Sequence, residues 1–263
     1  MDESQNDQAK RVAIQATGLA VAKKVLKPDF IARLNDALSA IYRKRREVQR
    51  RNGIADGMAG TCHHLLGDRT ALDELLERLP LDPVVRWFFN GPYILNSFGG
   101  FTNIAENAGG YIGNIHRDVR TFAPEFRLMM NFLIMLDDFT VENGATLLLP
   151  GSHRMAEKPD EADFMASAVP ATGKAGDILI FDSRVWHRAG TNRTGAARRA
   201  LTLTFTPPFF KQQLDYPRFL GPEYAARVSP KIRQILGYDA RQPETIEELY
   251  QPPERRAYKS DQG

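Results

Sequence analysis

The stretch that decides the fold is DILIFDSRVWHRAGTNRTGAARRALTLTFT, residues 177–206. It opens with an apolar run, Asp177 to Phe181, that is typical of a buried strand. It ends in Ala200 to Thr206, where apolar and hydroxyl side chains alternate with the period of two of a half-buried strand. A third short strand, Val185 to His187, lies between them. The pattern indicates short strands joined by turns, without helices between them.

Further short strands precede this stretch, and glycine and proline turns separate most of them. We expect strands at 93–102, 111–115, 127–136 and 146–149. Because most of the connections are too short for a helix, the pattern favours antiparallel sheets over a parallel α/β arrangement. The predicted fold class is mainly β with flanking helices, around a double-stranded β-helix, or jelly-roll, core.

Helical patterns lie on both sides of the predicted sheets. Helices are expected at 29–51, 70–79 and 83–90, and a modest amphipathic helix within 221–238. We expect one domain over 1–263, with a helical N-terminal part at about 1–91, a jelly-roll core at about 92–210 and a helical tail at 211–263. The charged segment 154–173 has no clear period and is interpreted as an insertion or lid over the barrel mouth.

Two histidines and one aspartate are the candidate metal ligands. His116 and Asp118 flank Arg117, and His187 ends the apolar run described above. Two imidazoles and one carboxylate bind one face of a ferrous ion and leave the opposite positions open. A His-x-Asp tripeptide also occurs by chance. Both histidines, however, lie on predicted strands, where a rigid scaffold can hold ligands.

The other three histidines fit this role less well. His63 and His64 lie in a polar region, predicted to be helical, that has no carboxylate in a matching pattern. His153 belongs to Pro150-Gly151-Ser152-His153, which is typical of a turn. His116 and His187 are therefore the better pair.

Arg198 opens the alternating strand and is a candidate ligand for a carboxylate. A guanidinium that points inward is costly unless a carboxylate meets it, and bidentate pairing to a carboxylate suits arginine. A dicarboxylic cosubstrate that chelates the metal at one end would reach Arg198 at the other. The alternative is a solvated arginine in a turn that also contains Arg193 and Arg199.

These residues carry a resemblance to the phytanoyl-CoA dioxygenase (PhyH) family of Fe(II)- and 2-oxoglutarate-dependent oxygenases, over nearly the whole chain. Besides His116-Arg117-Asp118, it rests on LDDFTVENGA at 136–145, PGSH at 150–153, and His187-x-x-Gly190-x-Asn192-x-Thr194 leading to Arg198. The resemblance implies that His116, Asp118 and His187 bind iron and are the catalytic centre. It also implies that Arg198 holds the far carboxylate of 2-oxoglutarate.

Two comparisons with the family pattern refine these expectations. The second residue after the distal histidine is often a hydroxyl residue that touches the cosubstrate, and here it is Ala189. Cosubstrate binding is therefore expected to rest on Arg198 together with Asn131 or Thr202. Relatives that transfer chloride replace the carboxylate with a small residue. Because Asp118 is present, we expect oxygen transfer or dehydrogenation instead of halogenation.

The family resemblance implies a hydroxylase that uses Fe(II), 2-oxoglutarate and O2 and releases succinate and CO2. Its substrate would be a small molecule from secondary-metabolite biosynthesis or small-molecule catabolism, and desaturation or ring closure stays open. Two alternatives are a cupin-like metal-dependent isomerase or lyase, which needs no 2-oxoglutarate, and a non-catalytic metabolite-binding barrel. The second has no need of an open redox-active site.

Several residues near the ligands are candidates for substrate binding. Arginines next to the ligands could attract an anionic substrate, although alternation along the strands places some of them outside the barrel: Arg117, Arg120, Arg184 and Arg188. Aromatic residues could line an apolar pocket or belong to the core: Phe98, Phe101, Tyr111 and Trp186.

Composition limits the remaining possibilities. The chain has 263 residues and 43% hydrophobic content, enough for a full core. Its one cysteine, Cys62, excludes an internal disulfide, and the first residues are polar, so we expect a cytoplasmic protein. No apolar run approaches a membrane span, so no membrane partner is expected.

The net charge of +3 raises the question of nucleic-acid binding. The basic residues Arg43 to Arg46, Arg50 and Arg51 lie at the end of a predicted helix, where positive charge complements the helix dipole. We therefore expect no nucleic-acid partner, and the sequence leaves the oligomeric state open.

Overall fold

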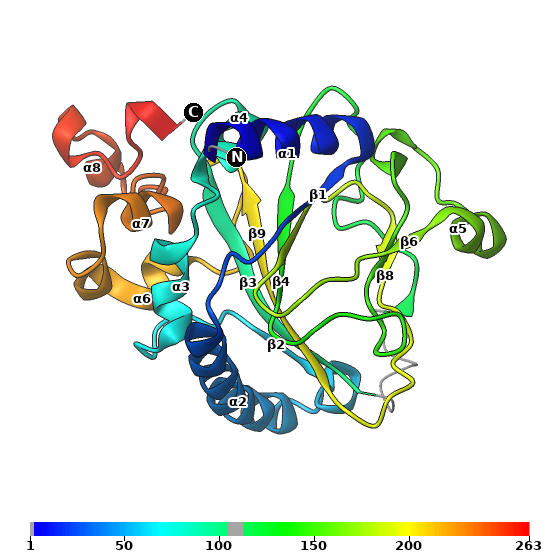
Figure 1. Cartoon of the computed structure of the whole chain (residues 1–263). Coiled ribbons are helices and arrows are strands. Elements are labelled where there is room, and N and C mark those ends of the chain that lie inside the picture. Colours follow the sequence, from blue (N-terminus) through cyan, green and yellow to red (C-terminus); the bar gives the residue numbers. More distant parts are fainter. Residues whose placement is uncertain (1–2, 105–112, 263) are drawn as a thin grey trace.

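Two antiparallel sheets form the centre of the protein, which we describe from a computed structural model of residues 3–104 and 113–262 (Figure 1). The larger sheet has the strand order β1-β7-β4-β9-β3-β2. Its strands are β1 (Leu19–Ala22), β7 (Ile178–Asp182), β4 (Met130–Met135), β9 (Arg198–Thr206), β3 (Ile94–Asn103) and β2 (Thr61–His63).

The smaller sheet has the order β6-β5-β8, and a β-bridge between His116 and His187 extends it. Its strands are β6 (Val169–Pro170), β5 (Leu147–Leu148) and β8 (His187–Arg188). Side chains from the two sheets meet in one buried cluster, which includes Leu133, Leu179 and Ala200 of the larger sheet and Leu148 of the smaller one. The two sheets therefore enclose an interior, as the predicted jelly roll requires.

Helices cover the outer face of the larger sheet (Figure 1). The N-terminal helices are α1 (Glu3–Thr17), α2 (Pro28–Arg51), α3 (Ala71–Arg78) and α4 (Asp82–Phe89). The later helices are α5 (Glu161–Ser167), α6 (Tyr216–Ala225), α7 (Pro230–Ile235) and α8 (Ile246–Leu249). The start of α3 is fixed by a capping box between Thr70 and Asp73, which satisfies amide groups that have no partner within the helix.

Alternation along the strands separates the interior from the helical layer. Phe132, Ile180 and Leu201 point outward into the cluster that contains the helices, whereas their neighbours Leu133 and Leu179 point inward. No helix in the described parts of the chain is long and apolar enough to cross a membrane.

The predicted fold class is confirmed, and so are the helices that became α2, α3 and α4. The strands predicted at 93–102, 127–136, 177–181 and 200–206 correspond to β3, β4, β7 and β9. The predicted strand 111–115 begins outside the described residues.

Three parts of the chain differ from the sequence prediction. Helix α1 and strand β1 were not predicted, and the region of His63, predicted to be helical, forms β2. The N-terminal part therefore supplies both edge strands of the larger sheet. The segment 154–173 holds α5 and β6, and its fully buried Phe164 packs with Leu149 and Trp186 on the smaller sheet.

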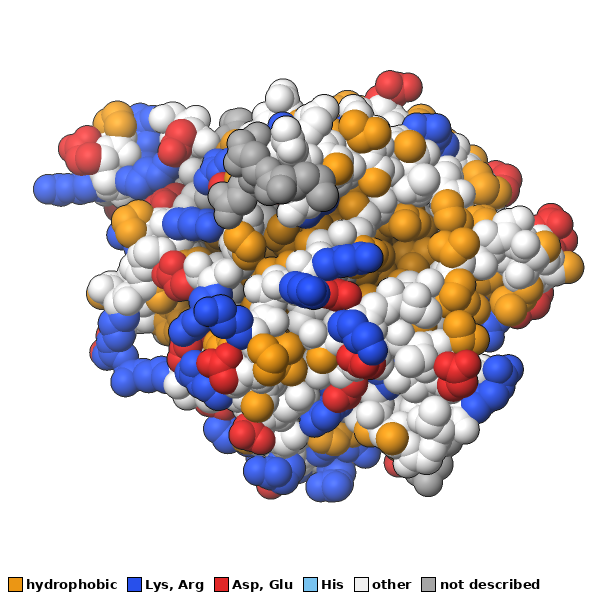
Figure 2. Space-filling view, in the orientation of Figure 1, with side chains coloured by type: hydrophobic (Ala, Val, Ile, Leu, Met, Phe, Trp, Pro, Cys, Tyr) orange, Lys and Arg blue, Asp and Glu red, His pale blue; other side chains and the backbone are white. Residues whose placement is uncertain are grey.

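The basic end of α2 is tied to its surroundings within the protein. Arg45 donates to the carbonyls of His63 and His64, and Lys44 pairs with Asp68. Figure 2 shows basic and acidic side chains interspersed over the lower part of the molecule, where α2 lies. This mixture is the pattern of an ordinary solvated helix face.

Candidate active site

His116, Asp118 and His187 converge at one point, where His187 is buried, His116 is half-buried and Asp118 is exposed. Each offers one ligand atom, and these atoms all lie within 4.8 Å of one another. The Nε2 atoms of His116 and His187 lie 3.8 and 3.9 Å from the two carboxylate oxygens of Asp118. Reciprocal backbone hydrogen bonds of 2.9 and 2.8 Å between the two histidines hold them side by side.

The backbone also fixes which ring nitrogens face the centre. Nδ1 of His116 lies 2.8 Å from the carbonyl oxygen of Asn114, and Nδ1 of His187 lies 2.9 Å from that of Val185. Because a carbonyl can only accept, each Nδ1 must carry the proton, which leaves the lone pair on Nε2. Burial lowers the pKa of His187, and the nearby His116 adds to this against the opposing Asp118 carboxylate. Both effects favour the neutral imidazole that a metal needs.

The Asp118 carboxylate is oriented by the inner wall of the larger sheet. Asn131 of β4 donates through Nδ2 to Asp118 Oδ2. The Asn131 carbonyl accepts a 2.8 Å hydrogen bond from the Thr204 hydroxyl of β9, which fixes the amide orientation. Such outer contacts position metal ligands and tune their basicity.

The donor set fits a ferrous ion. Two imidazoles and a carboxylate are the protein ligands found in non-haem Fe(II) oxygenases, where they leave the other coordination positions open.

Arg198 lies further along the same inner wall and is buried. Its Nε donates to the carbonyl of Asn143 at 3.2 Å, and its guanidinium lies 4.1 Å from the centre of the Phe139 ring. Burial lowers its pKa to about 10, so the side chain is charged at neutral pH. The Asp137 carboxylate opposes this effect and raises the pKa of Arg198, but Asp137 forms its ion pair with Arg199 on the opposite face of the strand. Among the residues that the structure describes, Arg198 is therefore a buried cation without an ion pair of its own.

The wall between the metal ligands and Arg198 carries polar and small residues. Thr202 of β9 pairs with Gly99 of β3, and Gly99 pairs with His63 of β2, so all three share the inner face. The point where a Cβ on Gly99 would sit lies 2.7 Å from the Thr202 hydroxyl and 3.6 Å from His63 Nδ1. A side chain at position 99 would thus crowd Thr202 on the inner face.

His63 is the interior residue that sequence reasoning missed. Its ring has no hydrogen-bond partner among the described residues, and burial lowers its pKa, so it is neutral. The signal that could have revealed it is weak, because a three-residue strand gives no usable periodicity.

Three residues predicted to bind substrate lie outside the barrel interior. Trp186 and Arg188 flank His187 and point to the opposite side of β8, where Trp186 packs with Phe164 of α5 and Arg188 pairs with Glu161. The Arg117 guanidinium stacks 4.9 Å from the Trp186 ring and donates to two carbonyls. Successive side chains along a strand point to opposite faces, so residues next to an inward-facing ligand point outward.

Two further predicted substrate residues, Phe98 and Arg184, are also placed elsewhere. Phe98 is fully buried between β3 and the helices. Arg184 is buried in an ion pair with Asp182. Tyr111 lies outside the described residues. His153 is buried near Gly18, away from the ligands, in agreement with the turn predicted there.

Comparison with known proteins identifies the family. The profile of the phytanoyl-CoA dioxygenase (PhyH) family matches residues 14–200. The chain belongs to the PhyH family. The matched region contains His116, Asp118, His187 and Arg198.

Relatives in the family support an oxygenase. An uncharacterized protein of Mycobacterium tuberculosis is 36% identical over 191 residues, which cover 72% of this chain and 67% of that protein. Dioxygenase andF of Emericella variicolor is 33% identical over 58% of this chain and 52% of its own length. Dioxygenase sphC of Aspergillus fumigatus is 30% identical over 49% of this chain and 37% of its own length. The chain thus spans about half or less of these two dioxygenases.

Solved structures share the fold. EvdMO1 matches with a TM-score of 0.61 and 25% identity, over 77% of this chain and 50% of that one. AviO1 from Streptomyces viridochromogenes matches with a TM-score of 0.54 and 25% identity, over 77% of this chain and 96% of that one. The non-heme alpha ketoglutarate dependent epimerase SnoN matches with a TM-score of 0.52 at 16% identity, which shows the fold alone.

Proposed function

We propose that this chain is one Fe(II)- and 2-oxoglutarate-dependent dioxygenase domain that hydroxylates a C–H bond of a small molecule and releases succinate and CO2. The observation that carries the proposal is that one interior holds both a triad whose ligand atoms lie within 4.8 Å of one another and a buried arginine that has no ion pair among the described residues. Without a bound ligand, both the triad and the buried Arg198 destabilise the fold, because polar or charged groups are removed from water without full compensation.

The residues take distinct roles in this proposal. His116, Asp118 and His187 would hold the iron, and Arg198 would hold the far carboxylate of 2-oxoglutarate, with Thr202 beside it. When bound, the iron and its cosubstrate supply the oxidising chemistry, and O2 is the second cosubstrate. Asn131 would act through Asp118, because its amide is already shared between Asp118 and Thr204.

Apolar walls would protect the reaction from water. Phe181 packs against His187 with ring centres 5.1 Å apart, and Leu133 and Leu179 continue the apolar surface behind it. Exclusion of water strengthens the charge interactions at the site and prevents side reactions. Two of the arginines that would favour an anionic substrate, Arg184 and Arg188, pair with Asp182 and Glu161, so we assign no charge to the substrate.

Anaerobic absorption spectroscopy with Fe(II) and 2-oxoglutarate tests the proposal. We expect a visible charge-transfer band from wild-type protein and none from His116→Ala. Arg198→Ala should need about 10- to 100-fold more 2-oxoglutarate, because a hydrogen-bonded charge pair contributes roughly 1.5–3 kcal/mol. Arg199→Ala is the matched control, since Arg199 is adjacent but pairs with Asp137 on the other face, and its titration should equal that of wild type.

The absence of a band from folded wild-type protein would contradict the proposal. It would favour a metal-dependent isomerase or lyase, or a metabolite-binding barrel. Equal titrations of Arg198→Ala and Arg199→Ala would remove Arg198 from the cosubstrate site while leaving the metal site intact.

A further inference from the structure

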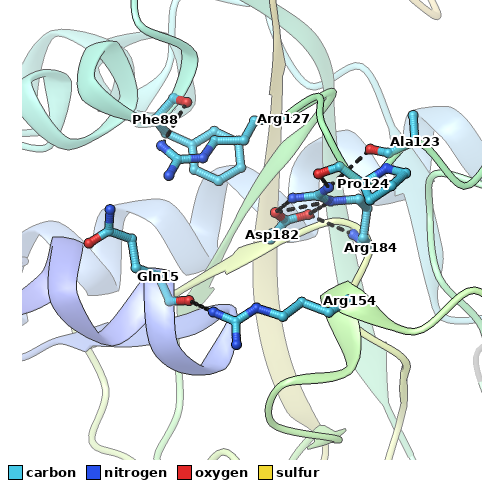
Figure 3. Close-up of polar contacts among 8 residues, drawn as sticks. All are labelled: Gln15, Phe88, Ala123, Pro124, Arg127, Arg154, Asp182 and Arg184. Carbon is cyan, nitrogen blue, oxygen red and sulfur yellow. Dashed lines mark hydrogen bonds and ion pairs between the residues drawn. The ribbon is translucent and has the colours of Figure 1, made fainter.

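Asp182 and Arg184 form a buried ion pair in the turn that joins β7 to β8. Their side chains are 3% and 6% exposed, and Arg184 Nη2 lies 2.7 Å from Asp182 Oδ2. Arg184 Nε and its backbone N–H also donate to Asp182 Oδ1, at 3.0 and 2.9 Å. Figure 3 shows the guanidinium lying flat against the carboxylate. One edge of the guanidinium thus makes three hydrogen bonds to the Asp182 carboxylate, and the backbone N–H makes a fourth.

The other edge of the Arg184 guanidinium reaches a different part of the chain. Its Nη1 donates to the carbonyls of Ala123 and Pro124, at 3.1 and 3.0 Å (Figure 3). These two residues lie midway in the connection 119–129, which runs from Asp118 to β4 and contains no helix or strand. A connection of this length has no hydrogen-bond ladder of its own to hold it in place.

Ser183, between the two charged residues, holds both ends of the same connection. Its carbonyl accepts from the backbone N–H of Asp118 at 3.0 Å and of Val119 at 3.4 Å. Its N–H donates to the carbonyl of Met129 at 3.1 Å. The turn 182–184 therefore contacts the connection at its start, its middle and its end.

We propose that Arg184 is a positioning residue for the Asp118 carboxylate, acting by fixing the connection 119–129 against the turn 182–184. The proposal rests on the metal-binding role proposed above for Asp118. A planar guanidinium suits this task, because its N–H groups point in fixed directions. They can bind a carboxylate on one side and two carbonyls on the other. A lysine has a single ammonium group and cannot reach both sides.

Stability alone is a poor explanation for the pair. The free energy that a buried ion pair loses on desolvation is about as large as the free energy that it gains from attraction. Apolar residues of similar volume often stabilise the fold equally well. What an apolar pair cannot supply is directional donors for Ala123 and Pro124. The expected consequence of losing Arg184 is thus a misplaced Asp118, beyond any loss of stability.

Metal binding and amide hydrogen exchange test this role together. For Arg184→Met we expect Mn(II) affinity, measured by calorimetry, to fall about 10- to 100-fold, as for other residues that orient metal ligands. The backbone amides of Asp118 and Val119 should also exchange faster in the metal-free protein. Arg184→Lys should keep its pair with Asp182 and fold, yet show the same two effects in weaker form. Arg199→Ala, which breaks an ion pair remote from Asp118, is the control and should show neither.

The outcomes separate this inference from the proposed function. Failure of wild-type protein to bind Mn(II) would refute the metal site itself. If wild type binds and both Arg184 variants bind equally well with unchanged exchange, the positioning role is wrong. Should Arg184→Met fail to fold, Arg184→Lys alone decides, because unchanged affinity and exchange in that variant would overturn the inference.

Discussion

At the scale of single residues, the buried charge of Arg198 destabilises the fold. Burial is the main cause of its lowered pKa, about 10. Because the pKa is lower in the folded than in the unfolded chain, the charged side chain destabilises the fold at every pH below about 10. This cost is largest at neutral pH and disappears as the pH rises toward the unfolded pKa.

The first prediction concerns removal of this charge. Arg198→Met should increase the free energy of unfolding of the metal-free protein at pH 7 by about 1–3 kcal/mol, since each pKa unit corresponds to about 1.4 kcal/mol. Urea unfolding followed by circular dichroism measures it. Arg199→Met is the control and should be neutral or destabilising, because it breaks the ion pair with Asp137. A less stable Arg198→Met would mean that the contacts with Asn143 and Phe139 outweigh the burial of charge.

The residues of the site differ in how well the sequence revealed them. His116, Asp118, His187 and Arg198 follow from residue type, spacing and the family resemblance, and the structure brings the first three together. His63 could not be found, because it reaches the interior only through its pairing with Gly99. Likewise, Arg184 is close to the ligand His187 in sequence, and only the structure shows that it forms an ion pair with Asp182.

At the scale of elements, the period of two in the strands decides which residues face the site. Gly99 and Gly100 are neighbours in β3 on opposite faces. A Cβ on Gly99 would meet the Thr202 hydroxyl, whereas a Cβ on Gly100 would lie 2.4 Å from Leu38 of α2. Neither glycine needs a left-handed backbone, so both arguments depend on space alone.

The second prediction compares alanine at these two positions. Gly100→Ala should lower the free energy of unfolding by about 1–3 kcal/mol, the usual effect of overpacking a core, with little change in the affinity for 2-oxoglutarate. Gly99→Ala should instead weaken the binding of 2-oxoglutarate, because it fills the interior beside Thr202, with a smaller loss of stability. Thermal unfolding and anaerobic titration of both variants measure this. The reverse pattern would contradict the assignment of faces.

Alternation also explains where the structure places several of the predicted substrate residues. Phe98 is one position before Gly99, so it faces the helices, and Trp186 and Arg188 flank an inward-facing histidine. The strands themselves could be predicted from their apolar patterns. The sequence of β8 could not show which of its faces points into the barrel. The strand has only two residues, and one face is buried under α5 while the other is buried in the barrel.

At the scale of the whole molecule, the C-terminal helices are joined to the N-terminal part through a histidine. His64 Nδ1 lies 3.0 Å from the hydroxyl of Tyr216 in α6, and the Tyr216 side chain is fully buried. Tyr224 of α6 adds a 2.8 Å hydrogen bond to Asp73 of α3. The sequence predicted a tail helix, but not its partner, because no local pattern encodes a contact across about 150 residues.

The third prediction is that acid loosens this connection. Burial, aided by the charges of His63 and Arg45, lowers the pKa of His64 to about 4. The unfolded chain binds this proton near its ordinary pKa of about 6.5, so stability should fall as the pH falls from about 6.5 toward 4. His64→Asn removes the titrating group and tolerates the positive φ of 56° at this position. It should reduce the loss of stability between pH 7 and 5 by about 1 kcal/mol, after allowance for partial exposure.

Tyr216→Phe, the control, removes the hydrogen bond and keeps the titrating group, so it should lower stability at both pH values. If wild type and His64→Asn lose equal stability on acidification in urea unfolding, the titration of His64 does not control the attachment of the tail.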